Sequence, residues 1–221
     1  MKIRSLSILV FILALAATAF ADSVTIFSTG VNGSGALLAS GAVDPHYVLI
    51  SGPFTPTAIV NYETGFWVPN SATSQWITPQ ATASQASSST GTYDYQTTFS
   101  LVGLDLGTVV ISGAFASDNL STISLNGSPT GIIENVCQLS CFTPFTINSG
   151  FVSGLNTLDF LVTNDGVATG LRVDLSGTAD PTSSTVPEPG TLWLLATGLL
   201  ALCGAVIRRR RMNPITTGEL Q

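Results

Sequence analysis

The 221-residue chain has few charges, and it lacks cations above all between its two ends. Residues 22–186 hold eleven Asp or Glu side chains but only one basic residue, Arg172. Because neutralising a phosphate backbone takes several Lys or Arg side chains, this composition excludes nucleic acid as a partner. Hydrophobic residues make up 45% of the chain, which argues against wholesale disorder. The sequence therefore predicts a folded and strongly acidic body.

Histidine and cysteine are scarce as well, with one histidine and three cysteines in the chain. A structural zinc site needs about four ligands, and a Ser-His-Asp system would have to use His46 as its base. Ser34 resembles a nucleophile elbow only in part, because Asn32 stands where the first glycine belongs. We expect no catalytic residue, no metal and no cofactor, with calcium as the one ion that loop oxygens could hold. His46 is expected at a turn where a strand starts.

The N-terminal residues 1–21 have the layout of a secretory signal peptide. Two basic residues precede an apolar stretch, which ends in Ala19-Phe20-Ala21. The small residues Ala19 and Ala21 form an A-x-A site, so we expect cleavage before Asp22. An uncleaved anchor is the alternative, but the apolar run is short for a membrane span. The segment predicts export.

A second apolar run covers residues 191–207, and a helix of 17 residues would be about 25 Å long, near the lower limit for a bilayer. It is followed at once by four basic residues: Arg208, Arg209, Arg210 and Arg211. Cations beside a span favour the cytoplasmic side, which leaves the body outside and residues 208–221 as a basic cytoplasmic tail. A buried core helix is the alternative, and it would have to accommodate the four adjacent charges.

The linker at residues 181–190 contains Pro187, Glu188 and Pro189 just before the span. Two prolines hold a segment extended, which suits either a plain spacer or a protease substrate. The order of Pro-Glu-Pro, apolar span and arginine cluster near the C-terminus resembles the PEP-CTERM sorting signal of Gram-negative bacteria. The resemblance implies processing by an exosortase, a transient stay in the inner membrane, and delivery to the cell surface or the extracellular matrix.

The body, residues 22–180, shows repeated alternation of apolar and polar residues, which is typical of half-buried strands. The clearest stretches are residues 93–101, 109–115, 123–125, 157–163 and 171–176. Asn126-Gly127 predicts a tight hairpin, and Gly113 predicts a bulge or a close backbone approach. Turn residues recur every 8–12 positions. We therefore predict an all-β, antiparallel β-sandwich that is jelly-roll-like.

Several segments of the body, taken in order over residues 44–178, are similar to galactose-binding-like jelly-roll domains. They are Tyr47-Val48-Leu49, Ser74-Gln75-Trp76-Ile77, Gly91-Thr92-Tyr93-Asp94-Tyr95, Gly113-Ala114-Phe115-Ala116-Ser117-Asp118-Asn119, Leu125-Asn126-Gly127, Gly154-Leu155-Asn156-Thr157-Leu158 and Gly170-Leu171-Arg172-Val173. The resemblance implies that loops at one end of the sandwich bind glycans. Fold alone does not decide function.

Four residues are candidates for such a ligand loop. Asp118 and Asn119 follow a predicted strand, and their oxygens suit a sugar hydroxyl or a calcium ion. An Asx turn is the alternative, and we favour it. Trp67 and Trp76 could stack on sugar rings, although aromatic residues in such patterns more often belong to a core.

Cys137 and Cys141 lie four residues apart in the exported body, where an oxidising compartment favours a disulfide between them. Cys203 falls within the predicted span.

Together these features predict an exported envelope or matrix component without enzymatic activity, with extracellular polysaccharide as a partner. A hydrolase that acts on extracellular glycans is the alternative, and a protein that stays tethered to the membrane is another.

Overall fold

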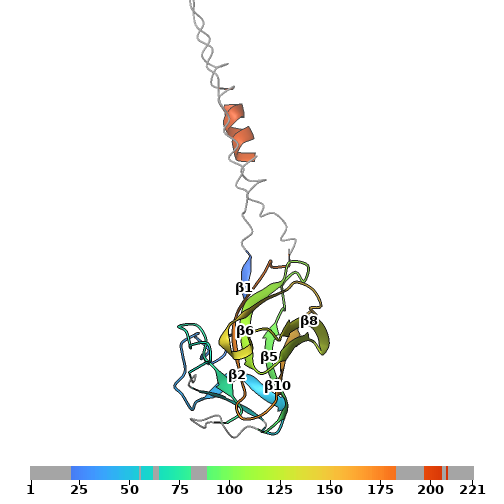
Figure 1. Ribbon diagram of the computed structural model, residues 1–221. Coiled ribbons are helices and arrows are strands. Elements are labelled where there is room, and N and C mark those ends of the chain that lie inside the picture. The colour runs from blue at the N-terminus through green and yellow to red at the C-terminus, as the bar shows by residue number, and fades with distance from the viewer. Residues whose placement is uncertain are drawn as a thin grey trace, which may run out of the picture. The chain divides into compact units, whose positions relative to one another are not determined.

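The computed structural model describes residues 21–54, 56–61, 65–80, 89–182, 197–205 and 208. The chain divides into two compact units, Met1–Thr182 and Ser183–Gln221. The first unit contains the β-rich body (Figure 1), and residues 197–205 of the second unit are helical. The described residues begin at Ala21. The signal helix predicted within residues 1–21 therefore lies outside them except for this last residue.

The framework of the body is a set of antiparallel strands. They are β1 (Asp22–Val24), β2 (Val43–Ser51), β3 (Thr57–Val60), β4 (Ile77–Thr78), β5 (Gly91–Ser100), β6 (Val110–Asp118), β7 (Ser121–Leu125), β8 (Ser128–Glu134), β9 (Thr143–Ile147), β10 (Leu155–Asn164) and β11 (Gly170–Ala179), with the 3-10 helix η1 (Gln138–Ser140) before β9. Neighbouring strands follow the order β8-β7-β10-β5-β2-β3-β4-β11-β6-β9, and β1 pairs with β11. This nearly closed sheet confirms the predicted β-sandwich.

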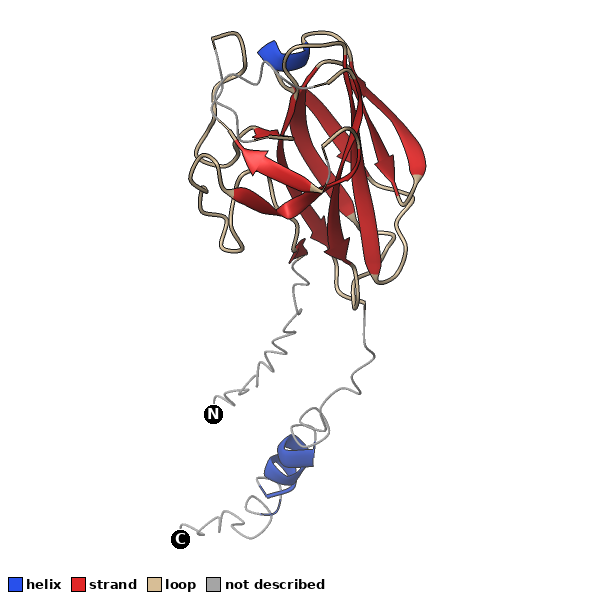
Figure 2. Ribbon diagram, turned by 90° about the horizontal axis from the view of Figure 1, so that it is seen from below, coloured by secondary structure: helices blue, strands red, loops and turns tan. Residues whose placement is uncertain are grey.

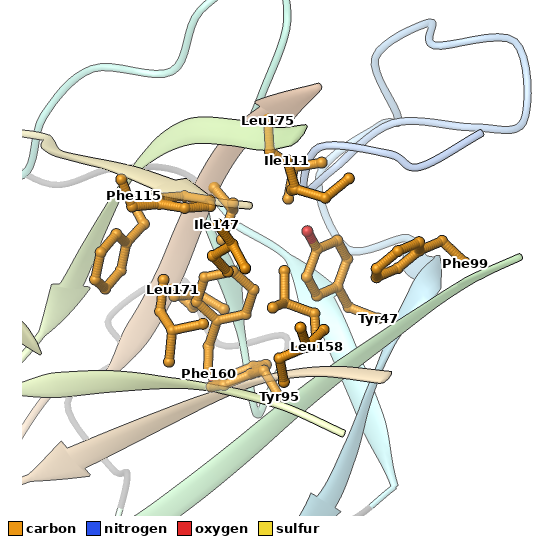
Figure 3. Packing of buried hydrophobic residues seen from close by; sticks show 14 of the residues in the cluster. Tyr47, Tyr95, Phe99, Ile111, Phe115, Ile147, Leu158, Phe160, Leu171 and Leu175 are labelled. Carbon is orange, nitrogen blue, oxygen red and sulfur yellow. The ribbon is translucent and has the colours of Figure 1, made fainter. Parts of the chain in front are cut away.

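The main hydrophobic core lies between two layers of strands. Side chains alternate along β5 and β10, so every second residue of each strand points inward. Figure 3 shows inward residues of β2, β5 and β10 facing those of β6, β9 and β11: Tyr47, Tyr95, Phe99, Leu158 and Phe160 on one side and Ile111, Phe115, Ile147, Leu171 and Leu175 on the other. The rings of Phe115 and Phe160 bring the layers together, with centroids 5.7 Å apart.

The register of β6 with β11 defines two ends of the sandwich. β6 starts at Val110, opposite Thr178, and runs to Asp118, opposite Gly170. β1 joins at the first of these ends, where Asp22 pairs with Ala179. We call this the terminal end, because the first and last strands of the body meet there. The opposite end, at which β6 stops and β11 begins, is the distal end, and Figure 2 shows η1 in blue among its loops.

Two backbone features predicted from the sequence are present. Asn126 and Gly127 both have positive φ, 52° and 74°, and they connect β7 to β8 as a tight hairpin. Gly113 lies against the β11 backbone, where an added Cβ would abut the Asp174 carbonyl and come within 2.8 Å of Leu175 Cα. Glycine at position 113 therefore allows β6 and β11 to approach closely.

A second apolar cluster covers the outer face of β6 and β11 near the distal end. Its buried members are Trp67, Trp76 and Ala116, and partly buried neighbours pack around them: Val68, Leu139, Phe142 and Ala168. Ala116 pairs with Arg172 on the next strand, whereas the adjacent pair, Phe115 and Val173, points into the main core. We call this group the tryptophan cluster. It binds the loops before β4 and β9 to the outside of the sandwich.

Arg172, the one cation of the body, is buried inside the tryptophan cluster with 1% of its surface exposed. Its Nε donates to Ser74 Oγ at 3.0 Å, and its Nη1 donates to the carbonyl oxygens of Val68 and Pro69. The guanidinium carbon lies 4.7 Å from the centre of the Phe142 ring, within cation–π range. Arg172 thus connects two loops to β11, one before β4 and one before β9.

Replacing Arg172 by Met keeps the length of the side chain but removes its donors. Buried carbonyl oxygens and Ser74 would then lose a charged partner, so we expect the free energy of unfolding to fall by about 2–4 kcal/mol. Urea unfolding followed by tryptophan fluorescence measures this change. The control is Val136→Ala, because Val136 is 87% exposed. A Met variant as stable as the wild type would contradict the role assigned to Arg172.

Candidate functional site

The distal end positions Asp118 and Asn119, the two polar residues predicted to form a ligand loop. Asp118 is the last residue of β6 and pairs with Gly170, the first residue of β11. The Asn119 N–H donates to the Thr163 carbonyl at 3.0 Å, which lays the short β6–β7 loop against the end of β10. The loop is therefore held by backbone pairing on both sides.

The Asn119 side chain connects two neighbouring loops. Its Oδ1 accepts the backbone N–H of Asp165 at 3.0 Å, and its Nδ2 donates to Gln138 Oε1 at 3.4 Å. One bond reaches the β10–β11 loop and the other reaches η1. The Asn119 amide thus holds two loops together, which agrees with a structural role. Its partners are distant in sequence rather than within an Asx turn.

Asp118 is buried, with 6% of the residue exposed. Burial raises its pKa to about 6, and the negative charge of Asp165 adds to the shift. Within the described part of the chain, no group of three or more His, Cys, Asp or Glu side chains is arranged to hold a metal ion. A calcium ion at Asp118 would therefore need other oxygens as most of its ligands.

The two candidate tryptophans reach the distal end but are buried there. The Trp67 ring rests on Gly170, where an added Cβ would lie 2.8 Å from the indole. The ring centroids of Trp67 and Trp76 are 4.3 Å apart, and the residues are 6% and 0% exposed. Trp76 Nε1 also donates to the Val68 carbonyl at 2.7 Å. This burial corrects the stacking expectation, because neither indole offers an exposed face to a sugar ring.

Cys137 and Cys141 form a disulfide that encloses η1. The loop is also held by Glu134, which is fully buried and accepts three successive backbone N–H groups with Oε1. These donors are Val136 at 3.0 Å, Cys137 at 3.0 Å and Gln138 at 2.6 Å. Sequence reasoning missed this residue, and the one available signal was an acid placed directly before a turn.

Asp94 and Asp159 form a second acidic pair, on the outer face of β5 and β10. Asp159 is directly opposite Gln96, whose Nε2 donates to Asp159 Oδ1 at 2.7 Å. Asp94 lies two residues before Gln96 and so shares its face. Burial raises the pKa of Asp94 to about 6, and the charge of Asp159 adds to the shift. The sequence did not reveal this pair, because strand pairing alone brings the two residues together.

His46 lies in β2, as expected for a residue near a strand start, and its ring stacks on Phe27 with centroids 3.8 Å apart. The nearby Asp44 carboxylate accepts three backbone N–H groups. The Ser34 hydroxyl instead donates to Asn32 Oδ1 at 2.7 Å within its own loop. These contacts give each of the three residues a local structural partner.

Residues 185–211 match the family model described as the PEP-CTERM protein-sorting motif. The chain carries a PEP-CTERM sorting signal. The matched range contains the Pro-Glu-Pro tripeptide of residues 187–189 and the arginines at 208–211. The motif implies an exported protein that has a C-terminal membrane anchor before sorting, and it implies processing by an exosortase.

Of the PEP-CTERM segment, the structure describes residues 197–205 and Arg208, all of them helical. Leucine side chains of this helix are well exposed: Leu199, Leu200 and Leu202 at 51%, 72% and 65%. Among the described residues, no helix has the length and apolar character needed to cross a bilayer. The predicted sorting residues 187–189, the arginines 209–211 and the signal residue Ala19 lie outside the described part.

No curated protein matches the chain. Among solved structures, a CBM35 from Paenibacillus barcinonensis is 16% identical, with a TM-score of 0.35 and coverage of 63% of this chain and 94% of that one. The Stig cyclase Fisc from Fischerella sp. TAU is 11% identical, with a TM-score of 0.37 and coverage of 73% and 100%. An exo-β-1,3-galactanase from Phanerochaete chrysosporium is 13% identical, with a TM-score of 0.24 and coverage of 65% and 30%.

Replacing Asp94 by Asn tests the electrostatics of the acidic pair. The folded state holds the Asp94 proton more tightly than the unfolded chain, since burial moves the pKa from 3.8 to about 6. The tightly held proton stabilises the folded state. This stabilisation is fully present below about pH 4 and is lost as pH rises through about 6. The variant should therefore become more stable relative to the wild type between pH 4 and pH 7.

Urea unfolding at each pH measures this difference. Thr98→Ala, on the same strand and without a titrating group, is the control. A difference between Asp94→Asn and the wild type that stays constant with pH would contradict the assignment.

Proposed function

We propose that this protein is a non-enzymatic component of the bacterial cell surface or extracellular matrix, delivered there by its C-terminal sorting signal, and that its body binds carbohydrate. The observation that carries the proposal is the PEP-CTERM match at residues 185–211. Export requires a signal at the other end of the chain, and residues 1–21 have that layout. Cleavage before Asp22 would leave a mature chain whose first residue is also the first residue of β1.

The arrangement of the body supports a role in display. Asp22 and Ala179 are paired at the terminal end, so the chain enters and leaves the sandwich at the same place. The loops around Asp118 and η1 lie at the distal end, away from both. A body attached through its C-terminal side would hold these loops away from the point of attachment.

The use of the carboxylates supports a non-enzymatic role. Asp44 and Glu134 each accept three backbone N–H groups, and Asp174 accepts the hydroxyls of Ser28 and Thr73. Side chains committed in this way stabilise turns and strand ends. They have little freedom to act as acids or bases on a substrate.

The composition of the body supports carbohydrate as the ligand class. Only 9% of the chain is charged, and the acidic body repels anionic polymers while leaving neutral polyols unaffected. Hydroxyl and amide side chains dominate the outer faces of β5 and β10, where Thr92, Gln96, Thr98 and Thr157 lie. Such groups bond sugar hydroxyls without the desolvation cost of a buried charge.

A second candidate function is hydrolysis of matrix glycans, which the Asp94–Asp159 pair favours. Glycoside hydrolases use two carboxyl groups, one of them with a raised pKa so that it can donate a proton. Asp94 has a pKa of about 6 and lies beside Asp159 on an outward face. The Gln96 bond to Asp159 leaves at least one carboxylate oxygen of that residue for other partners.

The sorting proposal is tested by changing the Pro-Glu-Pro tripeptide. We expect a Pro187→Ala, Glu188→Ala, Pro189→Ala variant to remain in the membrane fraction with its C-terminal residues intact, because the processing enzyme loses its substrate. The wild type should reach the surface without residues 208–221, as measured by mass spectrometry of its C-terminus. Glu219→Ala is the control. Surface-located wild type that still carries Arg208 to Gln221 would favour the tethered alternative.

The two functions are separated by assaying turnover. The mature protein is incubated with a panel of neutral and acidic oligosaccharides, and new reducing ends are measured over time. We expect none above the buffer blank. Turnover that disappears in both Asp94→Asn and Asp159→Asn, but not in the exposed-site control Val136→Ala, would instead establish the hydrolase.

A further inference from the structure

A cleft of about 540 Å³ opens at the terminal end of the sandwich. It lies between β1, the start of β2, the end of β5 and the first residue of β10. Among the described strands β1 pairs with β11 alone, and the cleft runs along the side of β1 that no strand covers. Its volume falls within the range of small-molecule sites.

The walls of the cleft combine apolar patches with hydroxyl groups. Val102 and Leu155 are 75% and 67% exposed, which is unusual for large aliphatic residues that lie close together around one hollow. Hydroxyls come from both sides of the cleft: Ser23 and Thr25 from the β1 side, and Thr98 and Ser100 from β5. A sugar ring has the matching chemistry, because its C–H faces are apolar and its edges carry hydroxyls.

His46 supplies an unsatisfied polar atom in the wall of the cleft. Its ring lies flat on Phe27, with an interplanar angle of 10°. Its Nε2 is buried and has no hydrogen-bond partner among the described residues. A buried polar atom without a partner costs stability. Nε2 has almost no water-accessible surface, so a ligand hydroxyl reaches it only when the side chains over it shift, and the new bond then removes that cost. Backbone bonding through Asp44 holds β2 in place at this point.

The charges around the cleft select a neutral ligand. No Lys or Arg is among the described residues that line it, and Asp22 contributes a carboxylate. Cleavage before Asp22 would add an α-ammonium group to the same residue and leave the cleft with no net charge from these two groups. A uronic acid or a phosphate would find no dedicated cation there.

We propose that this cleft is a binding site for a neutral saccharide, with Val102 and Leu155 against the apolar face of a sugar ring and His46 Nε2 bonded to a hydroxyl. This inference rests on the proposed carbohydrate affinity of the body, and it places the ligand at the terminal end rather than in the distal loops. The mature end at Asp22 then forms part of the site.

The test uses the mature protein and immobilised oligosaccharides of known charge. The neutral probes are cellohexaose, laminarihexaose, xylohexaose and mannohexaose, and the acidic probes are hexamers of galacturonate and guluronate. We expect binding to at least one neutral probe and none to the acidic probes. Binding should weaken about tenfold or more in Leu155→Asp, because the exposed apolar contact is replaced by a charge.

His46→Phe keeps the stack on Phe27 while removing Nε2, and we expect a similar loss. Val136→Asp is the matched control, since it introduces the same charge at an exposed valine near the distal end. Thermal unfolding of each variant should remain at the wild-type temperature, which separates lost binding from lost folding.

Three outcomes would overturn the proposal. Neutral-probe binding that is unchanged in both cleft variants would remove the ligand from the cleft while leaving carbohydrate affinity in place. Binding of acidic probes instead would overturn the ligand class. Absence of binding to every probe would overturn both this inference and the carbohydrate part of the proposed function, but not the sorting signal, which is measured separately.

Discussion

The buried guanidinium of Arg172 is the contact on which the outer layer of this structure depends. Loops cannot pack on the outside of a sheet unless their backbone carbonyls find donors. Arg172 supplies such donors to Val68 and Pro69 and also lies over the Phe142 ring. With the tryptophans packed around it, one side chain of β11 holds loops from two distant parts of the chain.

The shortage of cations elsewhere governs how the acids are used. With Arg172 occupied by carbonyls and a hydroxyl, the described acids of the body turn to backbone N–H groups and neutral side chains. Glu134 and Asp44 take three backbone donors each, and Asp159 takes the Gln96 amide. Burial still raises the pKa of Asp44, although its backbone donors oppose the shift, and it raises the pKa values of Asp94 and Asp118 to about 6.

Much of the fold follows from local pattern. Period-2 alternation predicts the long strands β5, β6, β10 and β11, because each strand buries one face. Asn126-Gly127 predicts the hairpin, because both residues adopt positive φ readily. The pattern is less informative near the N-terminus, where β1 is only three residues long and Phe27 stacks on His46.

The sequence predicted the candidate site less well than it predicted the fold. Trp67 and Trp76 were weighed as sugar platforms or as core, and burial against Gly170 and Ala116 makes them core. Whether an aromatic residue in a loop is exposed depends on which face that loop covers, and this is a long-range property. The cleft beside His46 could not be predicted either, because its walls come from four strands and two loops that are far apart in the sequence.

The sequence by itself determined that the chain carries a sorting signal for export, and it determined the class of the fold. Membranes and processing enzymes recognise sorting segments as linear motifs. The signal at residues 185–211 can therefore be identified without the tertiary structure. Alternation likewise reports the two faces of each strand. Only the tertiary structure decided which polar groups meet: Arg172 with the loop carbonyls, Asp94 with Asp159, and His46 with an open cleft. Strand pairing and loop packing set those contacts, and both depend on residues that are remote in the chain.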